Sequence, residues 1–508
     1  MNQFDIMKKI ILTTFLVGFG LIGCKDDFLT IVPKTNLSSA IFFKKEADFQ
    51  QAVNAAYVPL RSIVNDRAYL LGEMHSDNTY YARNILFGAT EQQEDIADFS
   101  VPTANGVTSN THVLNQYRLD YQIIARTNQI LALIDGVEFN ADSKNNLKGQ
   151  ALFLRAYAYF ELVRYFGKVP LHLLPVTVRQ EAALPLSEVT AIYDQIVKDA
   201  TAATTLLLPK SKQEAGRVTS GSAKILLANV FVVQKKWAEA EKQLKDVVSS
   251  GEYSLMANYA DAFSNTADNK NNAESVFEVQ FQEGASGYNG TLIYNFLPRP
   301  MSPEELKPIS GTSNPQPLTG EGNNTPTPDV IAAFEKGDKR TDASLGFVTL
   351  SGSLRDNKVY PYIKKFARVH SLHGNTGNNW PIYRYSEVLL FLAESLMEQG
   401  KPSEALPFLN QVRTRAGLPD TKAIAQTDLR TAIYQERRVE LAFENKRWFD
   451  LLRTGLAVEV ITAYGNRVKT KPLDYYYPTG AAARSNAFTN ISLLYGLPAD
   501  EAALSPYF

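Results

Sequence analysis

Two short stretches of the chain place aromatic rings next to groups that donate and accept hydrogen bonds. A tyrosine ring can cover the apolar face of a sugar, while amide, carboxylate and guanidinium groups bond the hydroxyls at its rim. The first stretch holds, within seven residues, Asp77, Asn78, Tyr80, Tyr81 and Arg83. The second holds Tyr288, Tyr294 and Phe296, with Asn289, Asn295 and Arg299 beside them. Both stretches are candidate ligand-binding surfaces, although each ring could equally pack beneath its own loop.

Catalytic and metal-binding patterns are weak by comparison. His370 and His373 form an H-x-x-H, but in a Gly/Asn loop without a carboxylate at ligand spacing. The chain contains no G-x-S-x-G, H-E-x-x-H or P-loop motif, and nothing nominates the two carboxylates that a glycosidase needs. The sequence therefore predicts a binding protein that is not an enzyme and needs no cofactor or metal. A hydrolase on a helical frame is an alternative that an acidic pair facing a cleft would favour.

One predicted helix, residues 434–453, carries a narrow charged stripe on a mainly apolar surface. The stripe consists of Arg437, Glu440, Glu444 and Arg447. A helix that is apolar on most sides is buried, so we interpret the stripe as an internal ion-pair ladder at i,i+3 and i,i+4 spacing. An arginine one turn from each glutamate would keep the carboxylates ionised, which argues against acid–base catalysis there.

The elements that must position these residues are helical hairpins. A segment from Tyr383 turns at Gly400-Lys401-Pro402 into a second apolar segment, and two helices joined by so short a turn pack antiparallel. A shift of 165 residues superposes Leu227, Ala228, Phe231, Ala240, Leu244 and Val247 on Leu392, Ala393, Leu396, Ala405, Leu409 and Val412. Looser hairpins pair 46–64 with 114–135, and 147–166 with 187–208. The predicted fold is mainly α, a scaffold of about four helix pairs like tetratricopeptide (TPR) repeats.

The segment between residues 252 and 380 breaks this pattern. It is rich in Asn, Gly, Ser and Pro, and its one clear strand alternates Phe277, Val279 and Phe281 with polar residues. A second strand is predicted from Tyr360 to Phe366. Irregular stretches of this length inside a compact protein are usually functional or mobile, and binding residues concentrate on loops held by rigid scaffolds.

Three motifs resemble signatures of the SusD/RagB family, surface lipoproteins of Bacteroidota that bind nutrients for an outer-membrane transporter. They are the segments Ala151–Leu171, Tyr383–Leu390 and Glu436–Arg453, the last reading E-R-R-x-E-L-x-F-E-x-x-R-W-x-D-L-x-R. The resemblance implies one domain over residues 24–508. In that domain, helical repeats occupy about 44–251 and 381–455, an irregular ligand-binding segment about 252–380, and a C-terminal tail 456–508. The family builds its ligand site from the loop after the first mature helix and from the irregular segment, where both aromatic stretches fall.

The N-terminus has the features of a lipoprotein signal. Lys8 and Lys9 precede a thirteen-residue apolar run that is too short for a comfortable membrane span. The run ends in Leu-Ile-Gly-Cys24, which resembles a bacterial lipobox, and Cys24 is the only cysteine in the chain. We therefore expect residues 1–23 to be removed and Cys24 to be lipidated. Lys25-Asp26-Asp27 resembles the acidic surface-export tag of Bacteroidota lipoproteins, and with the family resemblance this favours surface display over the alternative, a solvated tether.

Charge and family resemblance together define the expected partners. The formal net charge is −1, and no basic stripe indicates nucleic acid. The resemblance implies a protein anchored in the outer membrane, facing the exterior, that binds a nutrient, most often an oligosaccharide. It would deliver this nutrient to a SusC-like TonB-dependent transporter. The alternatives are a TPR scaffold that contacts only protein, and a lipoprotein that captures peptides.

Overall fold

The computed structural model describes residues 42–65, 68–82, 91–266, 269–319, 324–351 and 358–507. Helices dominate these residues, and the strands are short and paired only two by two. None of the helices in these ranges is long and apolar enough to cross a membrane. Cys24 and Arg83 lie outside the described residues.

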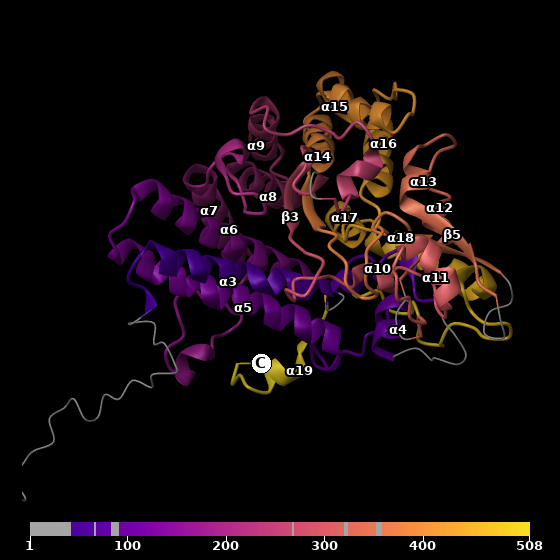
Figure 1. Ribbon diagram of the computed structural model, residues 1–508, viewed down its shortest axis with the longest axis horizontal. Coiled ribbons are helices and arrows are strands. Elements are labelled where there is room, and N and C mark those ends of the chain that lie inside the picture. Colours follow the sequence, from indigo (N-terminus) through magenta and orange to yellow (C-terminus); the bar gives the residue numbers. More distant parts are fainter. Residues whose placement is uncertain are drawn as a thin grey trace, which may run out of the picture.

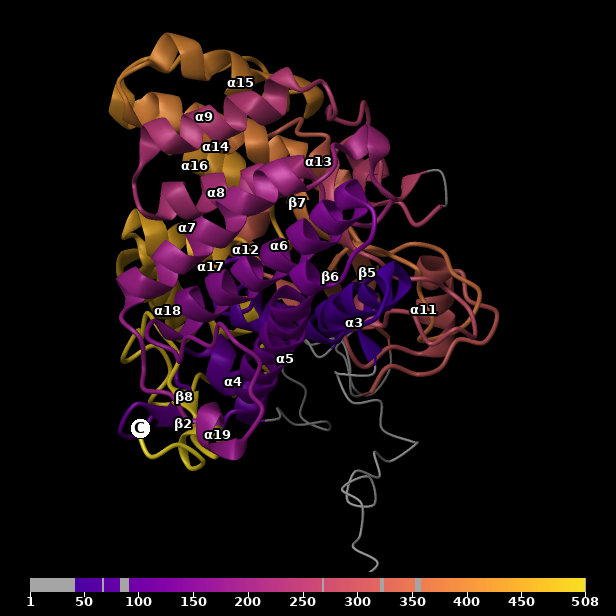
Figure 2. The ribbon, with the colours of Figure 1, turned by 90° about the vertical axis from the view of Figure 1, so that its left-hand side faces the viewer.

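Four antiparallel helix pairs form the body of the molecule, which confirms the predicted TPR-like fold. They are α3 (Glu46–Asn65) with α5 (Thr111–Leu133), α6 (Ala141–Phe166) with α7 (Val189–Leu206), α8 (Ser220–Val233) with α9 (Trp237–Ser249), and α14 (Tyr385–Glu398) with α15 (Pro402–Arg415). Contacts between α5 and α6, α7 and α8, and α9 and α14 join the pairs into one stack, which Figure 2 shows rising from α5 to α15.

Small residues allow the helices of the last two pairs to approach closely. Ala228, Ala240, Ala393 and Ala405 are all fully buried at the repeat positions identified in the sequence. In the last pair, Gly400 takes a φ of 73° at the turn between α14 and α15, a left-handed conformation that glycine adopts without strain. The repeated spacing in the sequence therefore corresponds to the same kind of helix pairing in α8 with α9 and in α14 with α15.

The other elements lie mostly on one side of the stack (Figure 1). Within the described residues, the other α-helices are α4 (Glu91–Ala97), α10 (Leu292–Asn295), α11 (Pro303–Ser310), α12 (Pro328–Ile331), α13 (Arg340–Ser344), α16 (Gln426–Glu440), α17 (Arg447–Thr454), α18 (Ala457–Thr470) and α19 (Ala499–Ala502). The strands are β1 (Thr79–Tyr80), β2 (Val107–Thr108), β3 (Ser275–Val279), β4 (Thr325–Pro326), β5 (Leu345–Thr349), β6 (Val359–Ile363), β7 (Trp380–Arg384) and β8 (Leu497–Pro498). Their pairs are β1–β4, β3–β7 and β5–β6, all antiparallel, and β2–β8, which is parallel.

Both predicted strands of the irregular segment are present, as β3 and β6. The alternating pattern predicted one polar face for β3, but all five of its residues are buried. Glu278 is buried there because its carboxylate accepts hydrogen bonds from the backbone of Asn271 (2.7 Å) and the side chain of Asn379 (2.6 Å). A buried polar group that is hydrogen-bonded in this way does not destabilise the strand.

The predicted helix 434–453 is broken in the structure. α16 ends at Glu440 and α17 begins at Arg447. Between them, Phe443 and Asn445 have φ values of 70° and 60°. The Glu73 carboxylate stabilises this turn by accepting hydrogen bonds from both backbone N–H groups, at 2.8 and 2.9 Å. Burial raises the pKa of Glu73 to about 7, although these hydrogen bonds lower it.

The break redirects the charged stripe, so the predicted ladder within one helix is wrong. Glu440 instead binds three arginines from other elements: Arg384 (2.8 Å), Arg415 (2.6 Å) and Arg340 (3.0 Å). All four side chains are almost completely buried. Burial by itself would raise the pKa of Glu440, but the arginines lower it well below its ordinary value, so the carboxylate stays ionised.

The other members of the stripe also find distant partners. Glu444 binds Arg384 (2.7 Å) and Lys365 (2.8 Å), Arg437 binds Asp450 (3.1 Å) and Glu387 (3.3 Å), and Arg447 binds Asp77 (2.7 Å). The charged residues of the stripe therefore form salt bridges that connect the end of α16 and the start of α17 to the segments around them.

The segment that follows η2 (Ala68–Leu71) runs through the interior and includes a buried histidine. His75 stacks on Phe99 with ring centroids 3.8 Å apart, and its Nδ1 donates to the carbonyl of Ile96 at 2.9 Å. Burial lowers the pKa of His75 to about 4, against the opposing effect of the Ile96 hydrogen bond. The ring is therefore neutral in the folded protein at mildly acidic pH.

The Glu440→Ala variant tests the buried ion pairs. Removing this carboxylate leaves Arg340, Arg384 and Arg415 without their shared partner, and breaking a buried pair in this way costs about 3 kcal/mol or more. Denaturant unfolding of the variant should show this loss. Asp194→Ala, which removes an exposed carboxylate in α7, is the matched control and should change stability by less than about 0.5 kcal/mol. Equal stability of the two variants would contradict the assignment.

The His75→Gln variant tests the buried imidazole through its pH dependence. Because the folded pKa of about 4 lies below the ordinary 6.5, the unfolded chain takes up a proton first as the pH falls. The stability contributed by neutral His75 is therefore fully present above pH 6.5 and is lost toward pH 4, by up to about 3 kcal/mol. Unfolding free energies of wild type minus variant should fall accordingly between pH 7 and pH 4.5. A difference that does not change with pH would show that the histidine is not protected from protonation.

Candidate functional site

The first aromatic stretch lies in the core rather than on the surface. Asp77 is buried in salt bridges with Arg447 (2.7 Å) and Arg438 (2.8 Å), whose charges lower its pKa although burial opposes them. Asn78 donates to Glu73 at 3.1 Å and accepts from Arg438 at 3.0 Å. These two side chains hold the segment against α16 and α17, and no part of them is offered to a ligand.

The tyrosines of this stretch are fully buried as well. Tyr80 donates to Asp98 and lies 2.8 Å from the hydroxyl of Tyr477. The Tyr81 hydroxyl accepts from Arg299, whose guanidinium also lies over the Tyr81 ring at 5.2 Å. The expectation of open sugar platforms is therefore corrected for Tyr80 and Tyr81, because packing occupies their faces. A role for Arg83, outside the described residues, stays a prediction.

The second stretch divides into a buried part and an exposed part. Tyr294 lies between His370, which its hydroxyl contacts, and His373, whose ring centroid is 4.4 Å away. Phe296 packs edge-on against Tyr69 at 4.9 Å. Tyr294 and Phe296 are both buried, which corrects the expectation that they are ligand platforms. The two stretches do meet, through Arg299 and Tyr81, but inside the protein.

Tyr288 differs from the other predicted residues because 47% of it is exposed. The guanidinium of Arg61, from α3, lies 4.5 Å from the centroid of the Tyr288 ring. A cation over a ring face is attracted by its quadrupole, so the contact fixes the orientation of the ring. An exposed, oriented tyrosine has the geometry needed to stack on a sugar.

The loop that carries Tyr288 is tied to its neighbours through backbone and amide groups. Asn289 donates to the carbonyl of Gly374 at 3.0 Å, and Gly290 forms an antiparallel bridge with Thr376. Asn65, the last residue of α3, donates to the Asn289 carbonyl and accepts from the backbone of Thr291. This bonding holds the loop against both the helical stack and the 371–376 segment, so the platform is preformed.

A depression of about 190 Å³ adjoins Arg61. Its polar lining includes Asn54, Glu214, Arg217 and Gln280, from α3, the turn before α8 and the end of β3. Arg217 donates to Asn54 at 2.8 Å and pairs with Glu214. Hydrogen bonds within the protein therefore hold these polar groups of the lining in fixed positions, as specific binding of a polar ligand requires.

Sequence reasoning located Tyr288 but missed Arg61, Asn54, Arg217 and Gln280. Arg61 and Asn54 are seven residues apart and therefore lie on one face of α3. This spacing is the one feature of the sequence that could have indicated a shared surface. The turn and the strand that complete the depression come from distant parts of the chain, so no local pattern identifies them.

The arrangement is suited to binding rather than to catalysis. Of the two carboxylates that line the depression, Glu214 is paired with Arg217, and Glu278 accepts hydrogen bonds from Asn271 and Asn379. Within the described ranges, no group of three or more His, Cys, Asp or Glu side chains could hold a metal ion.

Comparison with protein families gives two matches that together span most of the chain. Residues 346–505 match the model described as the SusD family. Residues 27–232 match a model described as starch-binding, associating with the outer membrane.

The alignments with individual similar proteins cover nearly the full length of this chain. A SusD-like protein, P25, from Formosa agariphila is 26% identical over 505 residues, which cover 90% of this chain and 91% of that protein. A solved structure of a laminarin-binding SusD-like protein has a TM-score of 0.71 at 24% identity, covering 91% of this chain and 98% of the other. Surface glycan-binding protein A from Bacteroides uniformis has a TM-score of 0.73 at 23% identity, covering 91% and 99%.

Proposed function

The chain belongs to the SusD/RagB family, and from this premise we propose that it is a surface lipoprotein that binds an oligosaccharide. The exposed, oriented ring of Tyr288, beside a polar depression, is the observation that carries the proposal. Similar proteins of this fold include one named as laminarin-binding and one named as a surface glycan-binding protein. The proposed binding surface, hereafter the Tyr288 surface, consists of Tyr288, Arg61, Asn54, Arg217 and Gln280.

The mode of binding follows from the chemistry of these groups. The free face of Tyr288 covers the apolar face of one sugar ring, while Arg61 holds the opposite face of the tyrosine. The guanidinium of Arg61 and the amide of Asn54 donate to the hydroxyls of a neighbouring sugar, whereas Gln280 and Arg217 shape the depression through hydrogen bonds within the protein. No bond is broken, and the protein acts without a cofactor or metal.

Anchoring and delivery complete the proposal. Lipidation of Cys24 attaches the protein to the outer membrane, consistent with the description of the matched N-terminal model. A SusC-like TonB-dependent transporter then receives the bound oligosaccharide.

The Tyr288→Ala variant tests the binding surface. Loss of a central aromatic anchor costs about 1–3 kcal/mol, so affinity for laminarin or another glycan that the wild type binds should fall about tenfold or more. Isothermal titration against neutral and acidic glycans, with a peptide mixture as a second ligand class, measures this.

Two control variants separate binding from folding. Tyr507→Ala removes an exposed tyrosine near the C-terminus and should leave affinity unchanged, whereas Tyr80→Ala opens the core and should lower stability. Wild-type affinity in Tyr288→Ala, or binding of peptides alone, would refute the proposal.

The Cys24→Ala variant tests the anchor. Each buried methylene of an acyl chain contributes about 0.8 kcal/mol to membrane binding, so a protein without its acylated cysteine should move to the soluble fraction. Fractionation and protease accessibility of whole cells measure location. A variant that stays in the membrane and on the surface would show that another segment anchors the protein.

A further inference from the structure

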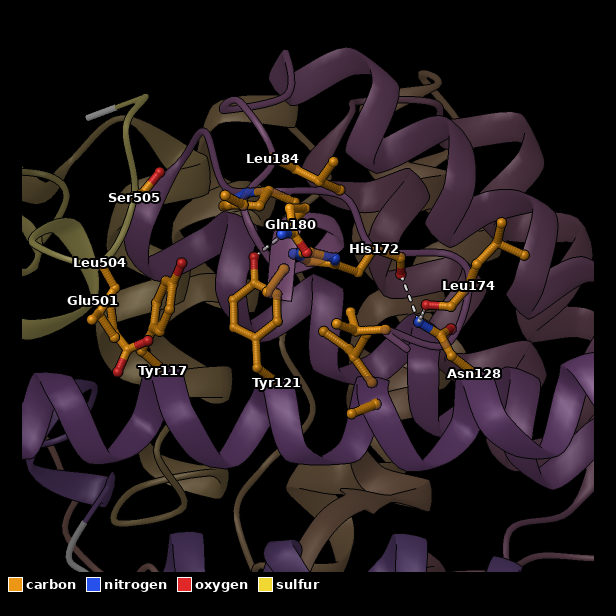
Figure 3. Close-up of a pocket in the computed structure, with 16 residues that line it drawn as sticks. Tyr117, Tyr121, Asn128, His172, Leu174, Gln180, Leu184, Glu501, Leu504 and Ser505 are labelled. Carbon is orange, nitrogen blue, oxygen red and sulfur yellow. Dashed lines mark hydrogen bonds between the residues drawn. The ribbon is translucent and has the colours of Figure 1, made fainter. Parts of the chain in front are cut away.

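A second pocket, which is lined mainly by apolar side chains, lies against α5. It has a volume of about 660 Å³, is open to solvent on one side, and is lined by α5, by the connection 170–184 and by the chain at α19 (Figure 3). Most of the lining is apolar and includes Ile124, Ala125, Pro170, Leu174, Val176 and Leu504. The pocket shares no residue with the Tyr288 surface.

The wall opposite α5 is held in place by hydrogen bonds. Tyr121 donates to the carbonyl of Pro170 at 2.6 Å, and Asn128 donates to that of His172 at 3.0 Å. Tyr159 from α6 donates to the same His172 carbonyl at 2.8 Å and accepts from the His172 backbone at 2.7 Å. The pocket therefore exists before any ligand arrives, which lowers the conformational cost of binding.

Two aromatic rings form part of the floor. Tyr117 and Tyr121, one helical turn apart on α5, have ring centroids 4.7 Å apart at 46°. Figure 3 shows both rings rising from α5 into the pocket, toward the 170–184 connection. Tilted rings at this separation offer an edge and a face to a flat ligand.

Apart from Glu501, the polar groups that line the pocket are uncharged at neutral pH. Burial raises the pKa of Tyr117 to about 12 and lowers that of His172, so the phenol keeps its proton and the imidazole is neutral. Gln180 and Ser505 add an amide and a hydroxyl. The carboxylate of Glu501 is compensated by Arg118, whose Nε lies 2.6 Å away. Such a lining penalises a charged ligand and can hydrogen-bond a neutral one.

The mouth of the pocket exposes apolar side chains. Leu174 is 74% exposed and Leu504 is 68% exposed, and Figure 3 shows them at opposite ends of the lining. Exposed apolar groups around a pocket gain free energy when a ligand covers them.

We propose that this pocket binds an uncharged small molecule with a flat apolar ring and one hydrogen-bonding edge. The ring packs between the tyrosine pair and the aliphatic wall, and the edge meets His172, Gln180 or Ser505. The aliphatic majority of the lining distinguishes this site from a sugar platform, and the proposal is independent of glycan binding.

Benzamide is the probe, because it is flat, uncharged and carries an amide edge. Benzoate has the same ring with a charge, and acetamide has the same amide without the ring. Ligand-observed NMR titration at millimolar concentrations, the range that ligands of this size reach, should show binding of benzamide. Benzoate should bind about tenfold or more weakly, and acetamide should not bind detectably.

Pocket-filling variants locate the binding. Ala125→Trp and Ser505→Trp fill the pocket from opposite sides, and each should weaken benzamide about tenfold or more. Gln122→Trp, at an exposed position on the same helix outside the pocket, should leave binding unchanged, and circular dichroism checks that all three variants fold.

Three results would overturn the proposal. They are absence of benzamide binding to the wild type, equal affinity for benzoate, and full affinity in both pocket-filling variants. Loss of association with a co-expressed transporter in these variants, without benzamide binding in the wild type, would overturn it in favour of a protein-docking role.

Discussion

The salt bridges between the buried carboxylate of Glu440 and three arginines determine how the helical stack and the irregular segment are placed relative to each other. Arg340 comes from the irregular segment, Arg384 from the end of β7 and Arg415 from the end of α15. Ions removed from water are tolerated only when oppositely charged groups and hydrogen bonds surround them. The network therefore specifies one relative placement of helical stack and irregular segment, since any other would leave a charge buried alone.

The break between α16 and α17 makes this network possible. A continuous helix would direct Glu440, Glu444 and Arg447 along one side, whereas the left-handed turn at Phe443 and Asn445 separates them. Arg447 then reaches Asp77, while Glu444 reaches Lys365 and Arg384. The network of salt bridges therefore also depends on Glu73, because its carboxylate accepts hydrogen bonds from the two backbone N–H groups of the turn.

Much of the scaffold was predictable from the sequence, because helix crossings depend on local periodicity and on small residues at fixed spacing. Ala393 and Ala405 identified a hairpin, and Ala228 and Ala240 identified its repeat. The break at Phe443 was not predictable, since its cause is a carboxylate some 370 residues away. The same limit applies to the binding surface. Tyr80 and Tyr288 look alike in sequence, and only tertiary packing buries one and exposes the other.

The contact between α9 and α14 has a consequence for the order of folding. α9 ends at Ser249 and α14 begins at Tyr385, yet the two helices are neighbours in the stack. The first three helix pairs can assemble from segments close in the chain, but the fourth must wait until the long intervening segment returns. Closing so long a loop has an entropic cost that local hairpins avoid, and non-local contacts of this kind slow folding. We therefore expect docking of α14 on α9 to be a late event, with the apolar side of α9 open to other chains until it is complete.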